Sequence, residues 1–295
     1  MSKSAVYFIH ALSPLHPGVG QGVGSVDLPV AREKATGVPY LPGSSVKGVL
    51  RDAARNAWGE NGKTKAIFGP DTDHAADHAG AAYFGDAKLL LLPVRSYAGV
   101  FAYATSPYLL RRFKREAEMA GLTPPELPAN PESQAKALVG KENEVVNKGK
   151  VYLEDLDFTA QTSDGVTAWE TWLLEHSQGL DLPLKGRLLF LDDDVMSFLL
   201  ETALEVVTRI RIDENTKTVA KGALWFEENI PAESVLYGLL SVAPKTFGPA
   251  NGAALPGEEV LEQLKGLAAR TLQFGGNATV GRGLSKLAFA LPKEA

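Results

Sequence analysis

The chain has 295 residues, a formal net charge of −5 and 45% hydrophobic residues, which is enough apolar material for a sizeable core. It contains no cysteine, so disulfides, thiolate metal sites and cysteine nucleophiles are excluded. No signal-peptide pattern opens the sequence and no apolar run approaches the ~20 residues of a membrane span, so we expect a cytoplasmic protein without a membrane partner. The acidic balance does not itself indicate nucleic-acid binding, but a local basic face is compatible with it.

The first predicted strand covers residues 5–11, where aromatic and β-branched residues are frequent. Residues 13–24 then carry four glycines at even spacing, which favour a loop whose backbone can approach a ligand. His16 and Asp27 lie on either side of these glycines. A histidine beside prolines is most often an ordinary loop residue, so the sequence pattern alone leaves the role of His16 open.

Residues 38–55 predict an extended piece, held by two prolines, that enters a helix through a Gly-Ser-Ser turn. Ser44 or Ser45 is expected to cap this helix. The free N–H groups and positive dipole end of a helix start suit a phosphate, although an ordinary capped surface helix fits equally well. Basic residues four apart share one face of the helix: Lys47, Arg51 and Arg55.

Three strands are predicted at 81–84, 87–94 and 98–105. The second contains four consecutive leucines, which favours a buried central strand. A helix at 108–120 follows Pro107, a residue suited to a first helical turn.

Two acidic segments have some features of metal sites. Residues 71–78 (DTDHAADH) hold two histidines four apart, but no remote ligand set accompanies them, so a solvated acidic loop is favoured. Residues 192–194 (DDD) precede an apolar run at 195–203, where acids suit the start of a helix. We therefore expect a helix at the second segment rather than a metal site.

Residues 208–225 predict a β-hairpin. Polar and apolar residues alternate strictly at 208–212. Residues 213–216 are turn-forming, and 217–225 form the returning arm. Its basic residues are expected on one face: Arg209, Arg211, Lys217 and Lys221. An edge hairpin kept soluble by its charges is the simple alternative.

The last part of the chain predicts a strand at 235–242, a helix at 261–272 and a closing strand at 284–291. A glycine-rich loop at 273–283 (QFGGNATVGRG) joins the helix to the closing strand.

Two stretches near opposite ends of the chain resemble the RAMP superfamily, the RNA-handling proteins of CRISPR systems. They are 41–51 (LPGSSVKGVLR) and the glycine-rich loop. Residues 24–33 (GSVDLPVARE) and 224–231 (LWFEENIP) further resemble the repeated backbone subunit of the Cmr-type (type III-B) effector complex. The equivalent subunit of Csm-type complexes is the nearest alternative, but the Glu-Glu-x-x-Pro segment is not expected there.

The mixed order of helices and strands, with several strands meeting in hairpins, predicts an α+β fold with an antiparallel sheet. The resemblance implies a modified RRM-like (ferredoxin-like) palm with a protruding β-hairpin thumb and a fingers-like insertion. We therefore expect a single domain over 1–295, with the insertion at about 121–190 and the thumb at about 205–228.

The resemblance implies metal-dependent cleavage of guide-paired target RNA, by attack of a ribose 2′-hydroxyl on its own phosphodiester. Asp27 is the implied catalytic and metal-binding residue, and His16 assists as proton donor or phosphate contact. Glu227 and Glu228 are implied to join the site at the base of the thumb. The expected cofactor is a divalent ion, Mg²⁺ or Mn²⁺, that is not tightly bound.

RNA binding is expected at the helix start, on the thumb and in the glycine-rich loop. The residues are Gly43, Ser44, Ser45, Lys47, Arg51, Arg55, Arg209, Arg211, Gly275, Gly276, Asn277, Gly281, Arg282 and Gly283. The implied partners are guide (CRISPR) RNA, target RNA, other Cmr-type subunits and further copies of the chain in a helical stack. Two alternatives stay open: a non-catalytic scaffold on guide RNA, and a guide-processing RAMP enzyme, which would need more histidines near the first helix than His16.

Overall fold

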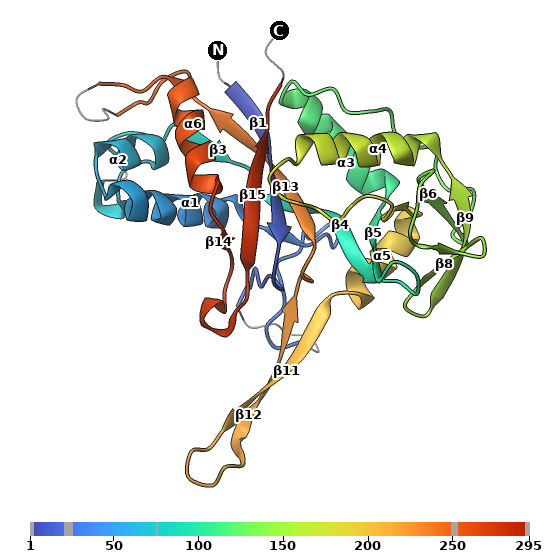
Figure 1. The fold of residues 1–295 in the computed structure, drawn as a ribbon. Coiled ribbons are helices and arrows are strands. Elements are labelled where there is room, and N and C mark those ends of the chain that lie inside the picture. The colour runs from blue at the N-terminus through green and yellow to red at the C-terminus, as the bar shows by residue number, and fades with distance from the viewer. Residues whose placement is uncertain (1–2, 21–25, 75, 249–252, 293–295) are drawn as a thin grey trace.

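The computed structural model of the chain describes residues 3–20, 26–74, 76–248 and 253–292. The predicted loop glycines Gly22 and Gly24, and the side chain of Lys221, lie outside the described part. Within it, thirteen strands form one large sheet, and two more form a separate hairpin. Figure 1 shows the sheet crossing the body of the molecule and the hairpin projecting from it.

The central strands of the large sheet are mostly antiparallel. They are β1 (Lys3–Ala11), β2 (Tyr40–Leu41), β3 (Ala82–Phe84), β4 (Ala87–Arg95), β5 (Phe101–Thr105), β13 (Val235–Val242), β14 (Leu272–Gln273) and β15 (Leu284–Ala290). Their order is β14-β15-β1-β13-β4-β5, with β2 beside β4 and β3 beside β13. Strand β1 therefore lies between two strands from the far end of the chain.

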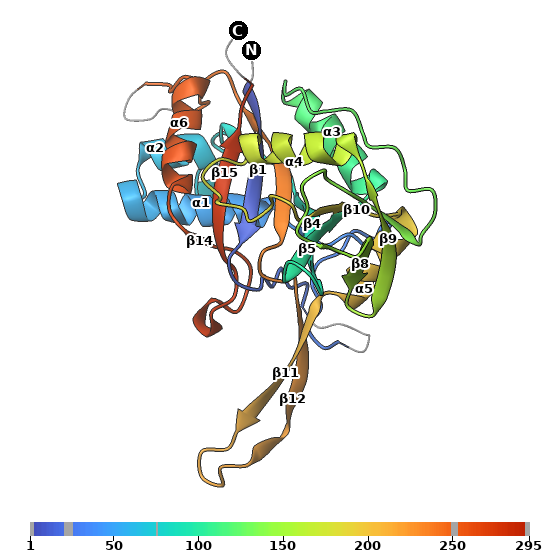
Figure 2. The ribbon, with the colours of Figure 1, turned by 45° about the vertical axis from the view of Figure 1, so that its right-hand side comes forward.

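Helices cover both faces of this sheet, as Figures 1 and 2 show. They are α1 (Gly43–Trp58), α2 (Gly62–Phe68), α3 (Pro107–Met119), α4 (Asp164–His176), α5 (Asp193–Thr202) and α6 (Gly257–Ala268), with short 3₁₀ turns η1 (Thr72–His74) and η2 (Ala278–Val280). No helix in the described ranges has the length and apolar character needed to cross a bilayer.

Strand β1 is buried along nearly its whole length because its alternating side chains enter two different cores. Tyr7 and Ile9 belong to the core that includes Val46 and Leu50 of α1. Phe8 belongs to the core on the other face, where its ring lies 5.6 Å from that of Phe113. A strand covered on both faces reads as a continuous apolar run, as β1 does.

The outer half of the large sheet is built by the region expected to be an insertion. Its strands are β6 (Lys136–Val139), β7 (Val146–Asn147), β8 (Lys150–Leu153), β9 (Leu156–Thr162) and β10 (Leu188–Phe190). The pairs β5–β10 and β6–β9 are parallel, so the expectation of an antiparallel sheet is wrong for these two pairs. Each pair is joined by a long crossover connection that returns the chain to the same end of the sheet, which parallel pairing requires.

The hairpin consists of β11 (Glu205–Ile212) and β12 (Val219–Asn229), which pair with each other. Its outer part projects away from the sheet in both ribbon views (Figures 1 and 2). One face of the hairpin exposes apolar side chains, among them Val206, Ile210, Leu224 and Phe226. This apolar face was not predicted, whereas the basic residues of the opposite face were.

Most predicted elements form, but several boundaries differ. Helix α1 begins at Gly43 with Pro42 as its N-cap, so the expectation that Ser44 or Ser45 caps it is wrong. Residues 57–78 contain helix α2, which was not predicted. Asp192 caps α5 through its side chain, as expected for the acidic run.

Candidate active site

Strand β12 runs from the hairpin into the body of the molecule. There, the edge that does not face β11 pairs with two loop segments, at the end of β12 and at Ile230 directly after it. Leu28 donates to the carbonyl of Phe226 at 3.0 Å and accepts from the N–H of Glu228 at 2.9 Å. Leu15 and Ile230 exchange both backbone hydrogen bonds, at 2.8 and 2.9 Å. The segments that carry His16 and Asp27 are therefore fixed on one strand at the root of the hairpin.

Asp27 is exposed at this edge. Its Oδ2 accepts a hydrogen bond of 2.8 Å from the backbone N–H of Phe226. Among the described residues nothing contacts Oδ1, which leaves one carboxylate oxygen available for a ligand. The backbone thus orients the carboxylate without neutralising it.

His16 is 6% exposed, and its Nδ1 lies 2.7 Å from the carbonyl oxygen of Glu228. A carbonyl only accepts, so Nδ1 carries the proton and Nε2 of the neutral ring is an acceptor. The attachment points of Asp27 and His16 on β12, at Phe226 and Glu228, are two residues apart, or about 7 Å along a strand. The two side chains are therefore held at neighbouring positions on one strand, Asp27 exposed and His16 buried.

The two glutamates predicted at the site are buried, with exposures of 4% for Glu227 and 7% for Glu228. Glu227 accepts from Trp225 Nε1 at 3.0 Å and Arg209 Nε at 3.2 Å. Burial alone would raise the pKa of Glu227, but these two donors, with the charges of Arg209 and His16, bring it below its ordinary value. Glu227 is therefore ionised and already partnered.

Glu228 is also fully engaged. Its Oε1 accepts from Arg32 at 2.7 Å and its Oε2 accepts from the backbone N–H of Val30 at 3.0 Å. Each oxygen of Glu227 and of Glu228 thus has a donor within the chain. Both side chains therefore link the Asp27 segment and the hairpin root to β12 through partners within the chain.

The glycine-rich loop packs against the His16 segment. Gly276 donates to the carbonyl of His16, and Gly283 to that of Pro14, each at 2.8 Å. Gly275 has a φ of +73°, and a Cβ there would lie 2.5 Å from the His16 carbonyl oxygen. Gly283 has a φ of +77°, and its Cβ would overlap the carbonyl oxygen of Phe274 at 1.8 Å. These two glycines are required by the close approach of the chain to itself.

The tip of that loop is free to contact a ligand. Asn277 and Gly281 have left-handed backbone conformations at the two ends of η2. Arg282 Nε and Asn277 Nδ2 are buried atoms without a hydrogen-bond partner among the described residues. Arg282 also lies close enough to Glu205 for its charge to oppose the rise that burial causes in the pKa of that carboxyl.

The start of α1 is less open than its sequence suggests. The N–H of Gly43, which is buried, donates to Asp86 Oδ1 at 2.8 Å, so one helix-start donor is already occupied. Ser44 is exposed and Ser45 is half-buried. The N–H of Ser45 donates to the carbonyl of Pro42 at 2.8 Å, so an incoming phosphate would meet the N–H of Ser44 and the two serine hydroxyls rather than Gly43.

The basic face of α1 is partly neutralised. Arg51 and Arg55 both form ion pairs with Glu60, and Arg51 also donates to the carbonyl of Pro70 at 3.1 Å. Lys47 is half-buried; burial lowers its pKa, and the charge of Arg51 adds to that effect. Lys47 makes no ion pair within the described residues, which makes it the available cation of this face.

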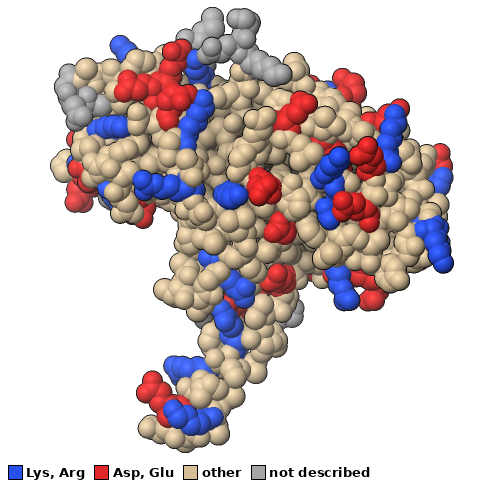
Figure 3. Space-filling model, in the orientation of Figure 1, with Lys and Arg blue, Asp and Glu red and all other residues tan. Residues whose placement is uncertain are grey.

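The hairpin carries the remaining predicted cations. Arg209 is held at the root by Glu227, whereas Arg211 is exposed at a bulge between Ile210 and Ile212 and has no partner in the described chain. Figure 3 shows Lys and Arg side chains along the hairpin, with acidic residues among them at its tip, and both signs of charge scattered over the body.

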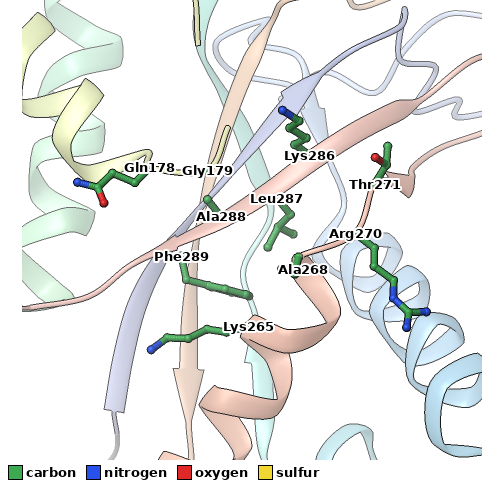
Figure 4. Close-up of a pocket in the computed structure, with 11 residues that line it drawn as sticks. Gln178, Gly179, Lys265, Ala268, Arg270, Thr271, Lys286, Leu287, Ala288 and Phe289 are labelled. Atoms are coloured by element: carbon green, nitrogen blue, oxygen red, sulfur yellow. The ribbon is translucent and has the colours of Figure 1, made fainter. Parts of the chain in front are cut away.

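Two other features are separate from this site. Figure 4 shows a pocket of about 300 Å³ between the end of α6 and β15, and none of its lining residues belongs to the site described above. In the acidic segment at 71–78, the carboxylate of Asp71 already has partners within the chain, because it bonds both His74 and Lys65. Across the described residues no cluster of three or more His, Cys, Asp or Glu side chains could hold a metal ion.

Sequence reasoning missed Arg32, Trp225 and Asp86, whose side chains hold Glu228, Glu227 and the start of α1. Arg32 and Asp86 act through contacts between distant parts of the chain, whereas Trp225 lies two residues from Glu227. Arg32 and Trp225 did stand inside the segments that carried the family resemblance, which was the one available signal for them.

Taken together, these features define an α+β palm protein with a projecting hairpin and an exposed carboxylate at the hairpin root. The family model described as the RAMP superfamily matches residues 8–286, and the chain belongs to that superfamily. The CRISPR system Cmr endoribonuclease Cmr4 of Pyrococcus furiosus is 40% identical over 289 residues, 97% of this chain and 95% of that protein. The CMR subunit Cmr4 of Saccharolobus solfataricus is 26% identical, over 95% of this chain and 94% of that protein.

Solved structures show the same likeness. The crystal structure of oligomeric Cmr4 from Pyrococcus furiosus superposes with a TM-score of 0.76 at 30% identity and covers 100% of both chains. A chain of the type III-B Cmr-beta complex bound to cognate target RNA gives a TM-score of 0.73 at 21% identity, covering 97% of this chain and 96% of that one, and so shares the fold.

Proposed function

We propose that the chain is the guide-RNA-binding backbone subunit of a type III-B CRISPR effector complex and cleaves the paired target RNA. The similar Pyrococcus furiosus protein is named an endoribonuclease of the Cmr system, and the likeness covers nearly all of both chains. Its partners are guide RNA, target RNA, other subunits of the complex and further copies of itself. Related structures include an oligomeric assembly and a complex with target RNA.

The observation that carries the cleavage proposal is the position of Asp27. It is an exposed carboxylate with one free oxygen, and it is fixed on the strand that carries the projecting hairpin. A hairpin with an exposed apolar face needs a covering surface, and nucleotide bases displaced from a duplex supply one. A target strand splayed by the hairpin would present its backbone at the hairpin root, where Asp27 lies.

The proposed reaction is attack of a ribose 2′-oxygen on the adjacent phosphorus. A bond from the 2′-oxygen to phosphorus forms and the bond from phosphorus to the 5′-oxygen breaks, which leaves a cyclic phosphate and a 5′-hydroxyl. Asp27 accepts the 2′-hydroxyl proton or holds a metal ion through Oδ1. His16, when protonated at Nε2, donates to the leaving oxygen or contacts the phosphate.

A divalent ion such as Mg²⁺ or Mn²⁺ fits this donor set as a loosely held group. Hard cations prefer oxygen ligands, and Mg²⁺ commonly keeps several waters and binds through one carboxylate and substrate phosphates. Asp27 supplies one such carboxylate oxygen, which is too few ligands for a tightly held ion. When bound, the ion would stabilise negative charge on the phosphate.

Guide RNA binding is proposed for the groups that face outward: Ser44, Ser45, Lys47, Arg211 and the tip of the glycine-rich loop. Backbone amides and cations read phosphate rather than base, which suits a subunit that must accept any guide. The ion-paired Arg51 and Arg55 join this surface only if RNA displaces Glu60.

A non-catalytic scaffold is the second candidate, because the carboxylates of Glu227 and Glu228 are already partnered and leave Asp27 as the reactive acid. The deciding experiment reconstitutes the complex with guide RNA and incubates it with matched or scrambled target. Regularly spaced cuts in matched RNA, with cyclic phosphate and 5′-hydroxyl ends, support the nuclease. An assembled complex that leaves matched RNA intact supports the scaffold.

A further inference from the structure

Arg32 makes contacts that the sequence motifs did not predict and that play no part in the proposed reaction. Its side chain is 24% exposed and its guanidinium donates to three acceptors. NH2 contacts Glu228 Oε1 at 2.7 Å, and NH1 contacts the carbonyls of Gly37 at 3.0 Å and Leu200 at 2.9 Å. These acceptors belong to three separate parts of the chain, so the fork of Arg32 joins them.

The contact with Glu228 fixes the segment that carries Asp27. Glu228 shares its carboxylate between Arg32 and the N–H of Val30, while Asp27 is held by Phe226 on the same strand. Residues 27–32 are thereby attached to β12 at both ends. Without Arg32, the segment would keep its backbone pairing around Leu28 and the Asp27–Phe226 bond, but Glu228, which also binds the N–H of Val30, would lose its charged partner.

The contact with Leu200 reaches the segment from which the other arm of the hairpin, β11, emerges. Leu200 lies in the last turn of α5, where carbonyls lack helical partners and no basic residue of the helix is present. Arg32 supplies the missing donor and positive charge. Strand β11 begins at Glu205, directly after α5, so Arg32 touches the structures from which both arms of the hairpin emerge.

We propose that Arg32 is a positioning residue that couples the orientation of the hairpin to Asp27 during target cleavage; the inference rests on the proposed function. Arg32 acts through Glu228 and the segment 27–32 and does not touch the reacting atoms. It also gives Glu228 a structural task in place of the direct catalytic role expected from the sequence. A planar guanidinium that bonds three acceptors in fixed directions suits this task, and lysine cannot reproduce its geometry.

The test compares guide-loaded complexes that contain wild-type chain, Arg32→Ala, Arg32→Lys or Arg112→Ala. Arg112 is the matched control, because it forms a similarly buried two-point ion pair with neighbouring Glu33 but contacts neither β12 nor α5. Single-turnover cleavage at saturating target should fall about 10- to 100-fold in Arg32→Ala, since misplacement of a reacting group by about 1 Å has effects of that order.

Target affinity should stay within about threefold of wild type, Arg32→Lys should recover part of the rate, and Arg112→Ala should cut at the wild-type rate. Hydrogen exchange at the amides of Leu28 and Val30 should accelerate in Arg32→Ala and not in Arg112→Ala. If the Arg32→Ala chain does not fold, the test depends on the cleavage rate and the amide hydrogen exchange of Arg32→Lys.

Combination with Glu228→Gln separates positioning from a direct role. If Arg32 and Glu228 act as one unit, the double variant Arg32→Lys/Glu228→Gln should be no slower than the slower single variant. Fully multiplicative losses would overturn the proposal, as would wild-type cleavage by Arg32→Ala. A wild-type complex that assembles but never cuts would overturn the proposed nuclease function itself.

Discussion

Asp27 and Phe226 lie 199 positions apart in the sequence, and the carboxylate of the first accepts the backbone N–H of the second at 2.8 Å. The N–H of Phe226 belongs to the same strand as the projecting hairpin. A displacement of that strand is therefore transmitted to the carboxylate proposed to act on RNA. We therefore expect the hairpin and the carboxylate of Asp27 to move together.

Asp27→Asn should abolish target cleavage and leave assembly and guide binding intact. The amide oxygen can still accept from Phe226, so the local fold is retained, but the negative charge is lost. Removal of an acid–base group typically lowers the rate by about 10²- to 10⁴-fold. A gel assay on matched complexes, with analysis of product ends, measures the effect.

Asp155→Asn is the control for this variant, because Asp155 is exposed in a turn of the outer sheet and undergoes the same chemical change. Asp155→Asn complexes should cut normally. Wild-type cleavage by Asp27→Asn complexes would identify Asp27 as an ordinary loop residue.

Replacing residues 212–217 by a short glycine-containing turn should leave folding nearly unchanged. The tip is exposed and is organised internally by Asp213, which accepts from Asn215 and Thr216. Target cleavage should fall or lose its regular spacing, because the shortened hairpin no longer separates nucleotides. Thermal melting checks the fold and product mapping checks the spacing; an unchanged ladder of products would argue against a wedge.

Removal of divalent ions should stop cleavage without unfolding the chain. The described residues contain no cluster of three or more metal-ligating side chains, so EDTA should leave the melting temperature unchanged. Added Mg²⁺ or Mn²⁺ should restore cutting. Full activity in EDTA would instead assign Asp27 the role of general base.

Guide binding should be insensitive to sequence and sensitive to salt. Each phosphate contact contributes about 0.7 to the slope of log K against log salt for single strands. Lys47→Ala should reduce the slope by about that amount, because Lys47 forms no ion pair with the part of the chain that the structure describes. Lys141→Ala removes an exposed cation that pairs with Asp164 at the start of α4. This variant should leave the salt slope unchanged. Strong preference among scrambled guides of equal length would contradict the expectation.

Acid should weaken the fold partly through Glu33. Hydrogen bonds from Arg112 hold the pKa of Glu33 below its ordinary value, despite partial burial. The pair therefore stabilises the fold above the unfolded-state pKa, near 4.5, and this stabilisation is lost as pH falls through the lower folded-state pKa. Melting curves from pH 7 to pH 3 should show Glu33→Gln destabilised by about 1–3 kcal/mol at neutral pH. The gap from wild type should narrow in acid; a gap that is constant with pH would exclude this ionisation.

Local patterns predicted most of the fold. The apolar run at β1, the strand 235–242 and the proline-started helix α3 form as expected because each is specified by neighbouring residues. Helix α2 was missed because it is only seven residues long and depends on burial of Ile67 and Phe68 rather than on helix propensity.

The site was less predictable because it depends on contacts across the chain. Asp27 and His16 were proposed through family resemblance, and only the fold reveals that both rest on β12. No spacing rule could show that Glu60 neutralises Arg51 and Arg55, or that Asp86 occupies the start of α1. The partners of Glu227 and Glu228 are likewise visible only in three dimensions.

The position of β1 has a consequence for synthesis of the protein. Its two strand partners, β13 and β15, are made near the end of synthesis, so this buried strand leaves the ribosome more than 220 positions before its first partner. Pairing over such distances is slow, and an unpaired apolar strand is prone to aggregation. The nascent subunit is therefore exposed to self-association until nearly its whole length is translated.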